Sequence, residues 1–284
     1  MRSSTRCCLN DTPRRGRRGI PRVRMGAVQL IAALLTLGTA ARGALAQSHP
    51  ALAAQLQPAL VASSLQAPPF SVGERLRYAV RLSAVNLRGH GAMWVDGPEM
   101  VRGTETYVLH FGFKAKLGPV KVSDTTESWL DPRRMASLRF VKRERHPFSS
   151  HDEDIALFPE EKRWSGADGS SGDAITAAPL DELSFIYFLR TVPLEADSVY
   201  RFNRHFDAAR NPTTVRVVGR EKVTVGAGTF DAVLVEMRVR DPARYRGDGV
   251  IRIHFTDDAR RLPLRIESTL PVAGTALLTL EALP

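Results

Sequence analysis

Two short stretches of this sequence carry side chains that could hold a metal ion or transfer protons. In HPFSSHDEDI, residues 146–155, the candidates are His146, His151, Asp152 and Asp154. Imidazole and carboxylate groups are good ligands for zinc and similar ions. The spacing matches no standard ligand pattern, so we favour a polar loop between two strands and predict no metal site.

The second stretch, TDDARRLPLRIE, residues 256–267, places Asp257 beside Asp258 and continues with Arg260 and Arg261. Paired carboxylates can perform acid–base catalysis or bind a metal ion. Adjacent residues of a strand point to opposite faces, so the two acids would converge only in a turn. We favour a structural turn in which an Asp side chain accepts from nearby backbone and Pro263 begins the next strand. No catalytic residue is predicted.

A third stretch, DELSFIYFLR, residues 181–190, combines a crowded apolar segment with an Arg at its end. As a helix it would begin at Asp181, a suitable N-cap, and place Arg190 at the negative C-terminal end. Pro193 would then stop it. The apolar side chains point in all directions around such a helix, which predicts burial on every side. A strand buried on both faces is the alternative that the pattern leaves open.

Arg190 needs a partner if this helix is buried, because an isolated buried guanidinium is very costly. The favoured partner is an internal carboxylate such as Asp181, Glu182 or Asp258. The alternative is the anionic head group of a ligand at the mouth of the sheet. Arg190 and Tyr187 are accordingly our candidate ligand-binding residues.

Most of the remaining chain alternates apolar and polar residues, as strands with one wet face do. The apolar face of residues 75–82, for example, holds Leu76, Tyr78, Val80 and Leu82. Turn-rich links separate such runs, which is typical of an antiparallel meander. A long sheet with one apolar face must be covered. The predicted fold is therefore mainly β: a curved antiparallel sheet that forms an open or half β-barrel, with one short buried helix inside its concave face.

The outward faces of the C-terminal strands are predicted to be charged. They hold Arg216, Arg238, Arg240, Arg252, His254 and Arg265, interleaved with Glu236 and Glu267. Cross-strand ion pairs on a wet face account for this pattern, and an anionic glycan or lipid surface is the alternative. Residues 159–179 are polar and rich in glycine, which predicts a mobile loop.

The N-terminal residues predict export. Residues 2–24 contain eight Arg and one Asp, and an apolar run follows that ends near the small residues Ala44 and Ala46. This order is typical of a secretory signal peptide, here residues 1–46 with cleavage after Ala46, whether translation starts at Met1 or at Met25. The apolar run is too short for a comfortable membrane span, so we expect no integral span after cleavage. We expect a periplasmic protein with a flexible lead-in at 47–69 and a β-rich domain at 70–284.

The charge of the chain lies mostly in this leader. The 40 Lys and Arg exceed the 30 Asp and Glu by ten, but nine Arg and one Asp lie in residues 1–46, which leaves 31 basic and 29 acidic residues beyond. So balanced a surface gives no electrostatic footprint for nucleic acid. Cys7 and Cys8 also lie in the leader, so we expect no disulfide, Cys-ligated zinc or thiol nucleophile, and we predict no cofactor.

Four stretches of this chain together resemble a family of exported bacterial proteins known as domain of unknown function 3108. They are PFSVGERLRYAV, DELSFIYFLRTVPL, VVGREKVTVGAGTFDAVLVEM and FTDDARRLPLRIE, and the likeness covers roughly residues 68–283. The family's usual aromatic residue ahead of the two acids is Phe255 here, followed by Thr256. The resemblance implies an exported protein with a β-rich, open barrel-like fold, and it does not identify a reaction.

These observations favour a non-enzymatic envelope protein, without closing the question of an enzymatic activity. It would bind an apolar or amphipathic ligand, or a protein partner, on the concave face of its sheet. Lipid, glycan or an envelope protein are the expected partners, and we expect a monomer. One alternative is a hydrolase acting on envelope glycan or lipid through Asp257, Asp258 or the 146–154 cluster. Another is an envelope assembly or scaffold factor that uses exposed strand edges.

Overall fold

A computed structural model describes residues 67–83, 86–117, 120–146, 149–240, 248–270 and 274–283. The first part of the chain contributes the strands β1 (Arg75–Leu82), β2 (Leu87–Val101), β3 (Thr104–Leu117), β4 (Val120–Asp131), β5 (Ala136–His146), β6 (Ser149–Phe158), β7 (Arg163–Gly166) and β8 (Ser171–Asp173). The second part contributes helix α2 (Glu182–Leu189), β9 (Val199–Phe202), the short 3-10 helix η1 (Ala208–Arg210), β10 (Thr213–Val225), β11 (Gly228–Arg240), β12 (Asp248–Thr256), β13 (Pro263–Leu270) and β14 (Gly274–Ala282).

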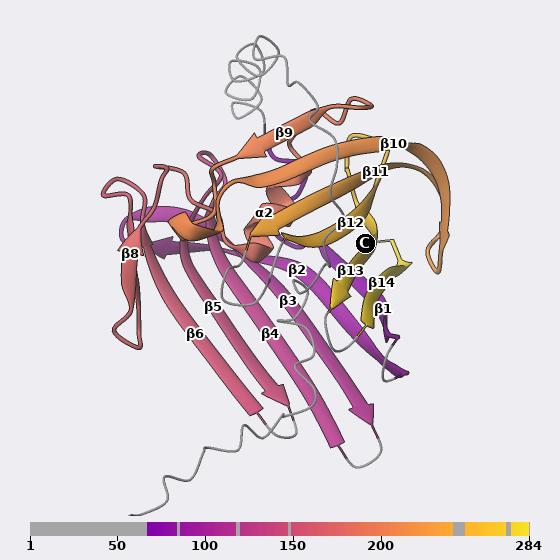
Figure 1. Ribbon diagram of the computed structural model, residues 1–284, viewed down its shortest axis with the longest axis horizontal. Helices are drawn as coiled ribbons and strands as arrows, with labels where there is room; N and C mark the ends of the chain where they lie inside the picture. The colour runs from indigo at the N-terminus through magenta and orange to yellow at the C-terminus, as the bar shows by residue number, and fades with distance from the viewer. Residues whose placement is uncertain are drawn as a thin grey trace, which may run out of the picture.

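All fourteen strands belong to one antiparallel sheet, in the order β8-β7-β6-β5-β4-β3-β2-β1-β14-β13-β12-β11-β10-β9. Consecutive strands are neighbours except β8 and β9, which form the two edges, and the pairing of β1 with β14 joins the two halves. The edges β8 and β9 do not pair with each other, so the sheet is curved but not closed into a barrel (Figure 1). The predicted fold class is therefore confirmed.

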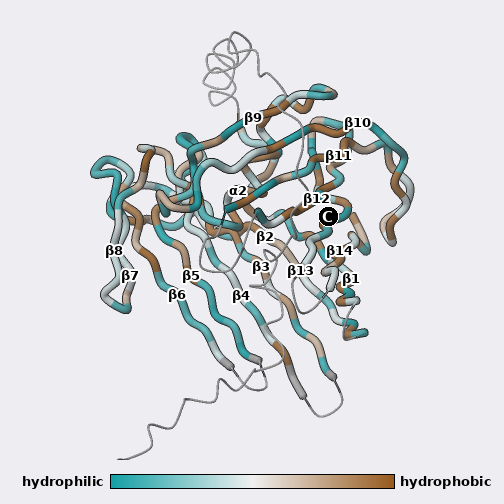
Figure 2. The backbone as a smooth tube through the Cα atoms, in the orientation of Figure 1, coloured by the Kyte–Doolittle hydropathy of each residue, from teal (hydrophilic) through white to brown (hydrophobic). Residues whose placement is uncertain are grey.

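Strand alternation places the core on one face of this sheet. In β1 the residues Leu76, Tyr78, Val80 and Leu82 are buried, and the residues between them are exposed or half-buried. Figure 2 shows the same mixture of apolar and polar residues along the other strands. Each large apolar side chain that is fully buried stabilises the fold by about 1.5–3 kcal/mol. The apolar face is therefore the main source of stability.

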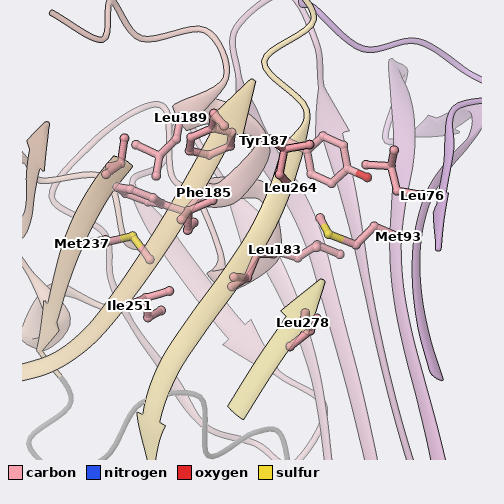
Figure 3. Close-up of a cluster of buried hydrophobic side chains, with 14 of the residues drawn as sticks. Leu76, Met93, Leu183, Phe185, Tyr187, Leu189, Met237, Ile251, Leu264 and Leu278 are labelled. Atoms are coloured by element: carbon pink, nitrogen blue, oxygen red, sulfur yellow. The ribbon is translucent and has the colours of Figure 1, made fainter. Parts of the chain in front are cut away.

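Helix α2 lies between the two halves of the curved sheet and fills the concave side (Figure 1). It packs against β3 and β4, and its residues Leu183, Phe185, Tyr187 and Leu189 join one core cluster with residues of β1, β2 and β10–β14. Figure 3 shows these side chains pointing into that cluster beside Leu76, Met93 and Leu264. The predicted central helix is confirmed, and the alternative of a doubly buried strand is wrong.

The helix begins at the predicted cap. The carboxylate of Asp181 accepts from the backbone N–H groups of Leu183 and Ser184, each at 2.9 Å, and the Ser184 hydroxyl accepts from the Asp181 N–H. These reciprocal bonds satisfy donors that a helix start otherwise leaves open. Ser128 on β4 also donates to Asp181 at 2.5 Å. Burial raises the pKa of Asp181 above its ordinary value, although these hydrogen bonds act in the opposite direction.

Two segments predicted as loops are partly strands. Residues 159–179 contain β7 and β8, because Trp164 packs against Phe206 and the backbone of Gly172 lies so close to the indole that a Cβ there would be 2.9 Å away. Residues 149–155 belong to β6. Arg145 and Arg139 on β5 pair with Asp152 and Asp154 on β6. These cross-strand ion pairs hold β6 in place without the alternating apolar residues by which a strand is usually recognised in a sequence.

The predicted signal peptide, residues 1–46, and most of the predicted lead-in, 47–69, lie outside the described residues. Phe70, where the β-rich domain was predicted to begin, is buried in the core. Within the part of the chain that the structure describes, no helix is both long enough and apolar enough to cross a bilayer.

Candidate functional site

A hollow of about 960 Å³ lies where five neighbouring strands, β14, β1, β2, β3 and β4, run side by side. Side chains of a strand alternate between its two faces, so the residues between the core positions point away from the core. Most of the residues that line the hollow belong to this outward set, for example Ala79, Arg81 and Thr279. We therefore call it the outer hollow.

The lining of the outer hollow is strongly basic. It includes Arg81, Arg88, His90, Lys114 and Lys116. No Asp or Glu is among the described residues that line it. The nearest ion-pair partner is Glu281, at 3.4 Å from His90, and the other four cations make no ion pair with a described carboxylate.

The strand register places these cations opposite one another. Arg81 lies directly opposite Arg88, and His90 lies directly opposite Lys114. Like charges in directly opposite positions destabilise a sheet. The opposite positions of Arg81 and Arg88 therefore carry an electrostatic cost across β1 and β2.

The side of the outer hollow at β1 and β14 is less polar than its middle, where β2 contributes Arg88 and His90. Ala79 lies opposite Thr279 and His90, and Leu277 lies opposite Arg81. Both Ala79 and Leu277 are half-buried. The aliphatic stems of Arg and Lys can extend such an apolar floor while their charged ends remain in water. The arrangement suits a molecule with both an apolar and an anionic part.

Three outward arginines elsewhere on the sheet have acidic partners. Arg238 and Arg252 both contact Glu236, at 2.9 and 3.1 Å, and Arg265 contacts Glu267 at 2.9 Å. The predicted cross-strand pairing is confirmed for Arg252 with Glu236, whereas Arg238 and Arg265 each pair with an acid on their own strand. His254 lies on the outward face of β12, opposite Arg265, but only 8% of its side chain is exposed, because Glu221 on β10 lies over it at 2.6 Å.

Arg190 and Tyr187, the predicted ligand-binding residues, lie at the end of α2 and not in the outer hollow. Both Nη atoms of Arg190 bind the carboxylate of Glu74, at 2.6 and 2.8 Å. One of them also donates to the carbonyl oxygens of Pro69 and Arg260. An internal carboxylate was predicted, but it is Glu74, because the start of β1 passes the end of the helix.

Tyr187 is completely buried and its ring meets that of Phe70 edge-on, with centroids 4.9 Å apart. Burial raises the pKa of its hydroxyl, and the nearby charge of Glu74 raises it further. Within the described residues this hydroxyl has no hydrogen-bond partner. Ligand binding by Arg190 and Tyr187 stays a prediction, while their contacts already tie α2 to the chain ahead of β1.

Asp257 and Asp258 form the predicted structural turn. Asp258 accepts from the Thr256 hydroxyl at 2.6 Å and from the Arg260 N–H at 3.0 Å. Burial alone would raise the pKa of Asp258, but the hydrogen bonds from Thr256 and Arg260 outweigh it and lower the pKa. Asp257 instead pairs with Arg220 at 2.7 Å. The two carboxylates therefore serve separate contacts and do not share a site.

The acids and the imidazole of β6 are also divided between contacts. Asp152 and Asp154 bind Arg145 and Arg139, whereas His151 lies 2.9 Å from Glu153. The side chain of His146 lies outside what the structure describes. Among the described side chains, no group of three or more His, Cys, Asp or Glu could hold a metal ion.

A second hollow, of about 620 Å³, lies over β6 and η1 and includes His151, Asp152 and Asp154. Its lining mixes acids with the bases Arg143 and Arg210. Their charges are partly neutralised within the protein, as in the pair of Arg143 with Glu127. This hollow therefore has no single charge with which to select a ligand.

Sequence reasoning missed the cations of the outer hollow. The alternation of β1 did assign Arg81 to an outward face, but Arg88, His90, Lys114 and Lys116 lie on strands whose neighbours the sequence did not identify. If residues 88–90 and 114–116 had been assumed to form neighbouring strands of a hairpin, His90 could have been placed opposite Lys114. The contribution of β14 required the structure.

Comparison with known proteins gives a family and a fold. The profile of the family described as "Protein of unknown function (DUF3108)" matches residues 77–281. No curated protein shows significant similarity to the chain. A crystal structure of a β-barrel-like protein of domain of unknown function DUF1849 from Brucella abortus is similar, with a TM-score of 0.52 and 14% identity, covering 75% of this chain and 97% of that one.

Two further crystal structures are more distant. One is described as an exported protein with a YmcC-like fold from Bacteroides fragilis, with a TM-score of 0.33, 14% identity, and coverage of 76% of this chain and 97% of that one. The other is described as a lipoprotein from Parabacteroides distasonis, with a TM-score of 0.33, 12% identity, and coverage of 77% and 99%. The Brucella structure supports the barrel-like fold alone.

Proposed function

This chain belongs to the DUF3108 family, which is described only as of unknown function, and from that premise we propose that it is an exported envelope protein that acts by non-covalent binding. Its ligand is an amphipathic molecule with an anionic group, and its binding site is the outer hollow. The periplasmic location rests on the basic and then apolar residues 1–46, which have the order of a signal peptide.

The observation that carries this proposal is the group of four Arg and Lys side chains in the outer hollow that make no ion pair with a described carboxylate. Five basic side chains and no described carboxylate line a space of about 960 Å³. Sites for small molecules commonly measure roughly 300–1,000 Å³ and combine an apolar floor with a few polar groups. Ala79 and Leu277 supply the floor, and the cations select a negative charge.

Binding on this outer face accords with the filled concave side. Sequence reasoning expected the ligand on the concave face, but α2 brings Leu183, Phe185, Tyr187 and Leu189 into the core there, each at most 4% exposed. Protein interiors are packed as densely as organic crystals, so these side chains leave little room for another molecule. The outward face of β1–β4 is the surface that stays accessible.

Non-covalent binding is favoured over hydrolysis by the state of the candidate acids. Asp257 and Asp258 are held in a turn by Arg220, Arg260 and backbone, and the acids of β6 are held in ion pairs. General acid–base catalysis needs groups within hydrogen-bond reach of one reacting centre. Each of these carboxylates is instead engaged by a different cation: Asp257 by Arg220, Asp258 by Arg260, Asp152 by Arg145 and Asp154 by Arg139.

Native mass spectrometry of protein purified from the envelope of its own host tests the proposal. We expect a bound mass in the wild-type protein that is lost in Ala79→Trp, because an indole at this outward position would occupy the floor of the outer hollow. Asp257→Asn/Asp258→Asn is the matched control and should retain the bound mass. Protein that is ligand-free in every preparation, or an adduct that survives Ala79→Trp, would contradict the proposal.

A further inference from the structure

We propose that the outer hollow docks the protein onto the phosphate head groups of an anionic phospholipid bilayer. This inference rests on the proposed binding function and narrows its ligand to one class. The observations behind it are the spread of the cations over several strands, the opposed positions of Arg81 and Arg88, and the apolar residues beside them.

The cations are too widely spread for a single small anion. Arg81 lies on β1, Arg88 and His90 on β2, and Lys114 and Lys116 on β3. Neighbouring strands lie about 4.8 Å apart, so this group extends roughly 10 Å across the sheet before the length of the side chains is added. A surface that carries many phosphates could contact several of these cations at once, whereas a single phosphate ion could contact only some of them.

The cations that lie opposite each other on neighbouring strands favour binding of a negatively charged surface to this face of the sheet. Arg81 and Arg88 lie opposite each other and repel each other in the protein alone. On the other half of the sheet, by contrast, Arg238 and Arg252 share Glu236. The sheet therefore neutralises Arg238 and Arg252 on its outward face, whereas Arg81 and Arg88 make no ion pair with a described carboxylate.

The apolar floor favours a lipid surface over a hydrated polyanion. Leu277 on β14 lies opposite Arg81, and Ala79 on β1 lies opposite His90, so both apolar residues lie beside the cations. Peripheral proteins bind membranes by combining buried apolar area with attraction to anionic lipids. A soluble anionic glycan or nucleic acid would meet the cations but would gain nothing from this floor.

The expected strength is that of reversible, peripheral binding. A basic residue close to an anionic membrane strengthens binding about fivefold at physiological ionic strength. The four Arg and Lys side chains of the outer hollow together give an enhancement of several hundred-fold, on the order of that product. Attraction of this kind is screened within about 10 Å at 0.1 M salt and about 3 Å at 1 M salt.

Co-sedimentation with vesicles tests the inference on protein purified from its host's envelope. We expect binding to vesicles that contain phosphatidylglycerol, no binding to pure phosphatidylcholine, and loss of binding at about 1 M salt. Arg81→Gln/Arg88→Gln should bind roughly 30-fold more weakly, because two cations are removed. Equal binding of this variant and the wild type would overturn the inference.

The matched control is Arg133→Gln/Arg201→Gln, which removes the same charge at two exposed positions outside the outer hollow. It should bind vesicles as the wild type does, and an equal loss in this variant would also overturn the inference, since net charge alone would then explain binding. Inorganic phosphate and a soluble anionic polysaccharide should compete poorly with the vesicles. Tight binding of either one that depends on Arg81 would show that the outer hollow binds that ligand, and it would overturn the bilayer inference.

The two proposals fail in different ways. If vesicles do not bind but the native adduct is still lost in Ala79→Trp, the outer hollow binds another amphiphile, and only the bilayer inference is refuted. If the native adduct is absent and vesicles also fail to bind, both are refuted.

Discussion

Removal of the charge of Glu74 should cost this protein far more than the loss of an ordinary surface ion pair. The side chain of Arg190 is 1% exposed and that of Glu74 is 10% exposed. In Glu74→Gln the guanidinium keeps its bonds to the carbonyl oxygens of Pro69 and Arg260 but loses its only carboxylate among the described residues. Breaking a buried pair by removal of one partner costs about 3–5 kcal/mol.

The hydrogen bonds lead to the same magnitude. Two charge-assisted bonds join Arg190 to Glu74, at 2.6 and 2.8 Å. Each bond to a charged group contributes about 1.5–3 kcal/mol, so their loss gives about 3–6 kcal/mol before any relaxation. For a domain of this size a loss of 3–5 kcal/mol lowers the melting temperature by about 10 °C.

Urea unfolding followed by tryptophan fluorescence measures the effect. The series is Glu74→Gln, Arg190→Met and the double variant, which together form a double-mutant cycle. We expect the double variant to cost less than the two single changes combined, by about 2–3 kcal/mol, because each single change leaves one buried group without its partner. If the dependence of the free energy of unfolding on urea concentration has the same slope in every variant, a shift in the urea midpoint reports a change in stability.

The control pair is Lys222 with Asp231, whose side chains are 73% and 74% exposed. Lys222→Met should cost under about 1 kcal/mol, as exposed pairs do. The reasoning is refuted if Glu74→Gln costs no more than this control, or if the two single changes are simply additive. Either result would mean that water or another group already solvates the guanidinium of Arg190.

Three further predictions concern other parts of the molecule. Burial, aided by the charge of Arg210, lowers the pKa of His205 to about 3 from 6.5. Between these two pH values only the unfolded chain binds the proton, so the free energy of unfolding falls as pH falls, by about 3 kcal/mol from pH 7 to pH 4. In urea unfolding, His205→Gln should lose less stability than the wild type over this pH range, and an equal loss in both proteins would contradict the prediction. Arg81→Gln should leave the melting temperature unchanged or raise it, because it removes the repulsion from the opposite strand, and a clear decrease would show a structural role instead. Gly89→Ala should destabilise the protein by about 1–3 kcal/mol in the same assay, because a Cβ there would lie 2.5 Å from the backbone oxygen of Lys114, whereas a neutral result would show that β3 can shift.

The sequence was sufficient for the class of fold because the relevant signals are local. Alternation in residues 75–82 predicts which face of β1 is buried, and the structure agrees for Leu76, Tyr78, Val80 and Leu82. The cap at Asp181 and the all-round apolar character of residues 183–189 likewise predict a buried helix. Each of these features depends on neighbours within one turn of helix or one strand.

The sequence was misleading where a contact with a distant residue replaces the usual local signal. Residues 159–179 look like a loop, but the packing of Trp164 against Phe206 organises two short strands. His254 follows the outward positions of β12, yet Glu221 from another strand covers it. Neither Phe206 nor Glu221 is close in sequence to the residue that it contacts.

The tertiary structure alone decided the candidate site, for the same physical reason. Alternation assigns a side chain to a face, but it does not say which strand lies beside it. The pairing of β1 with β14 places Leu277 opposite Arg81, and the pairing of β2 with β3 places Lys114 opposite His90. Arg190 likewise acquires Glu74 only when the start of β1 passes α2. Local patterns therefore determined the strands, the helix and their buried faces, while the register between distant strands determined where the charges gather.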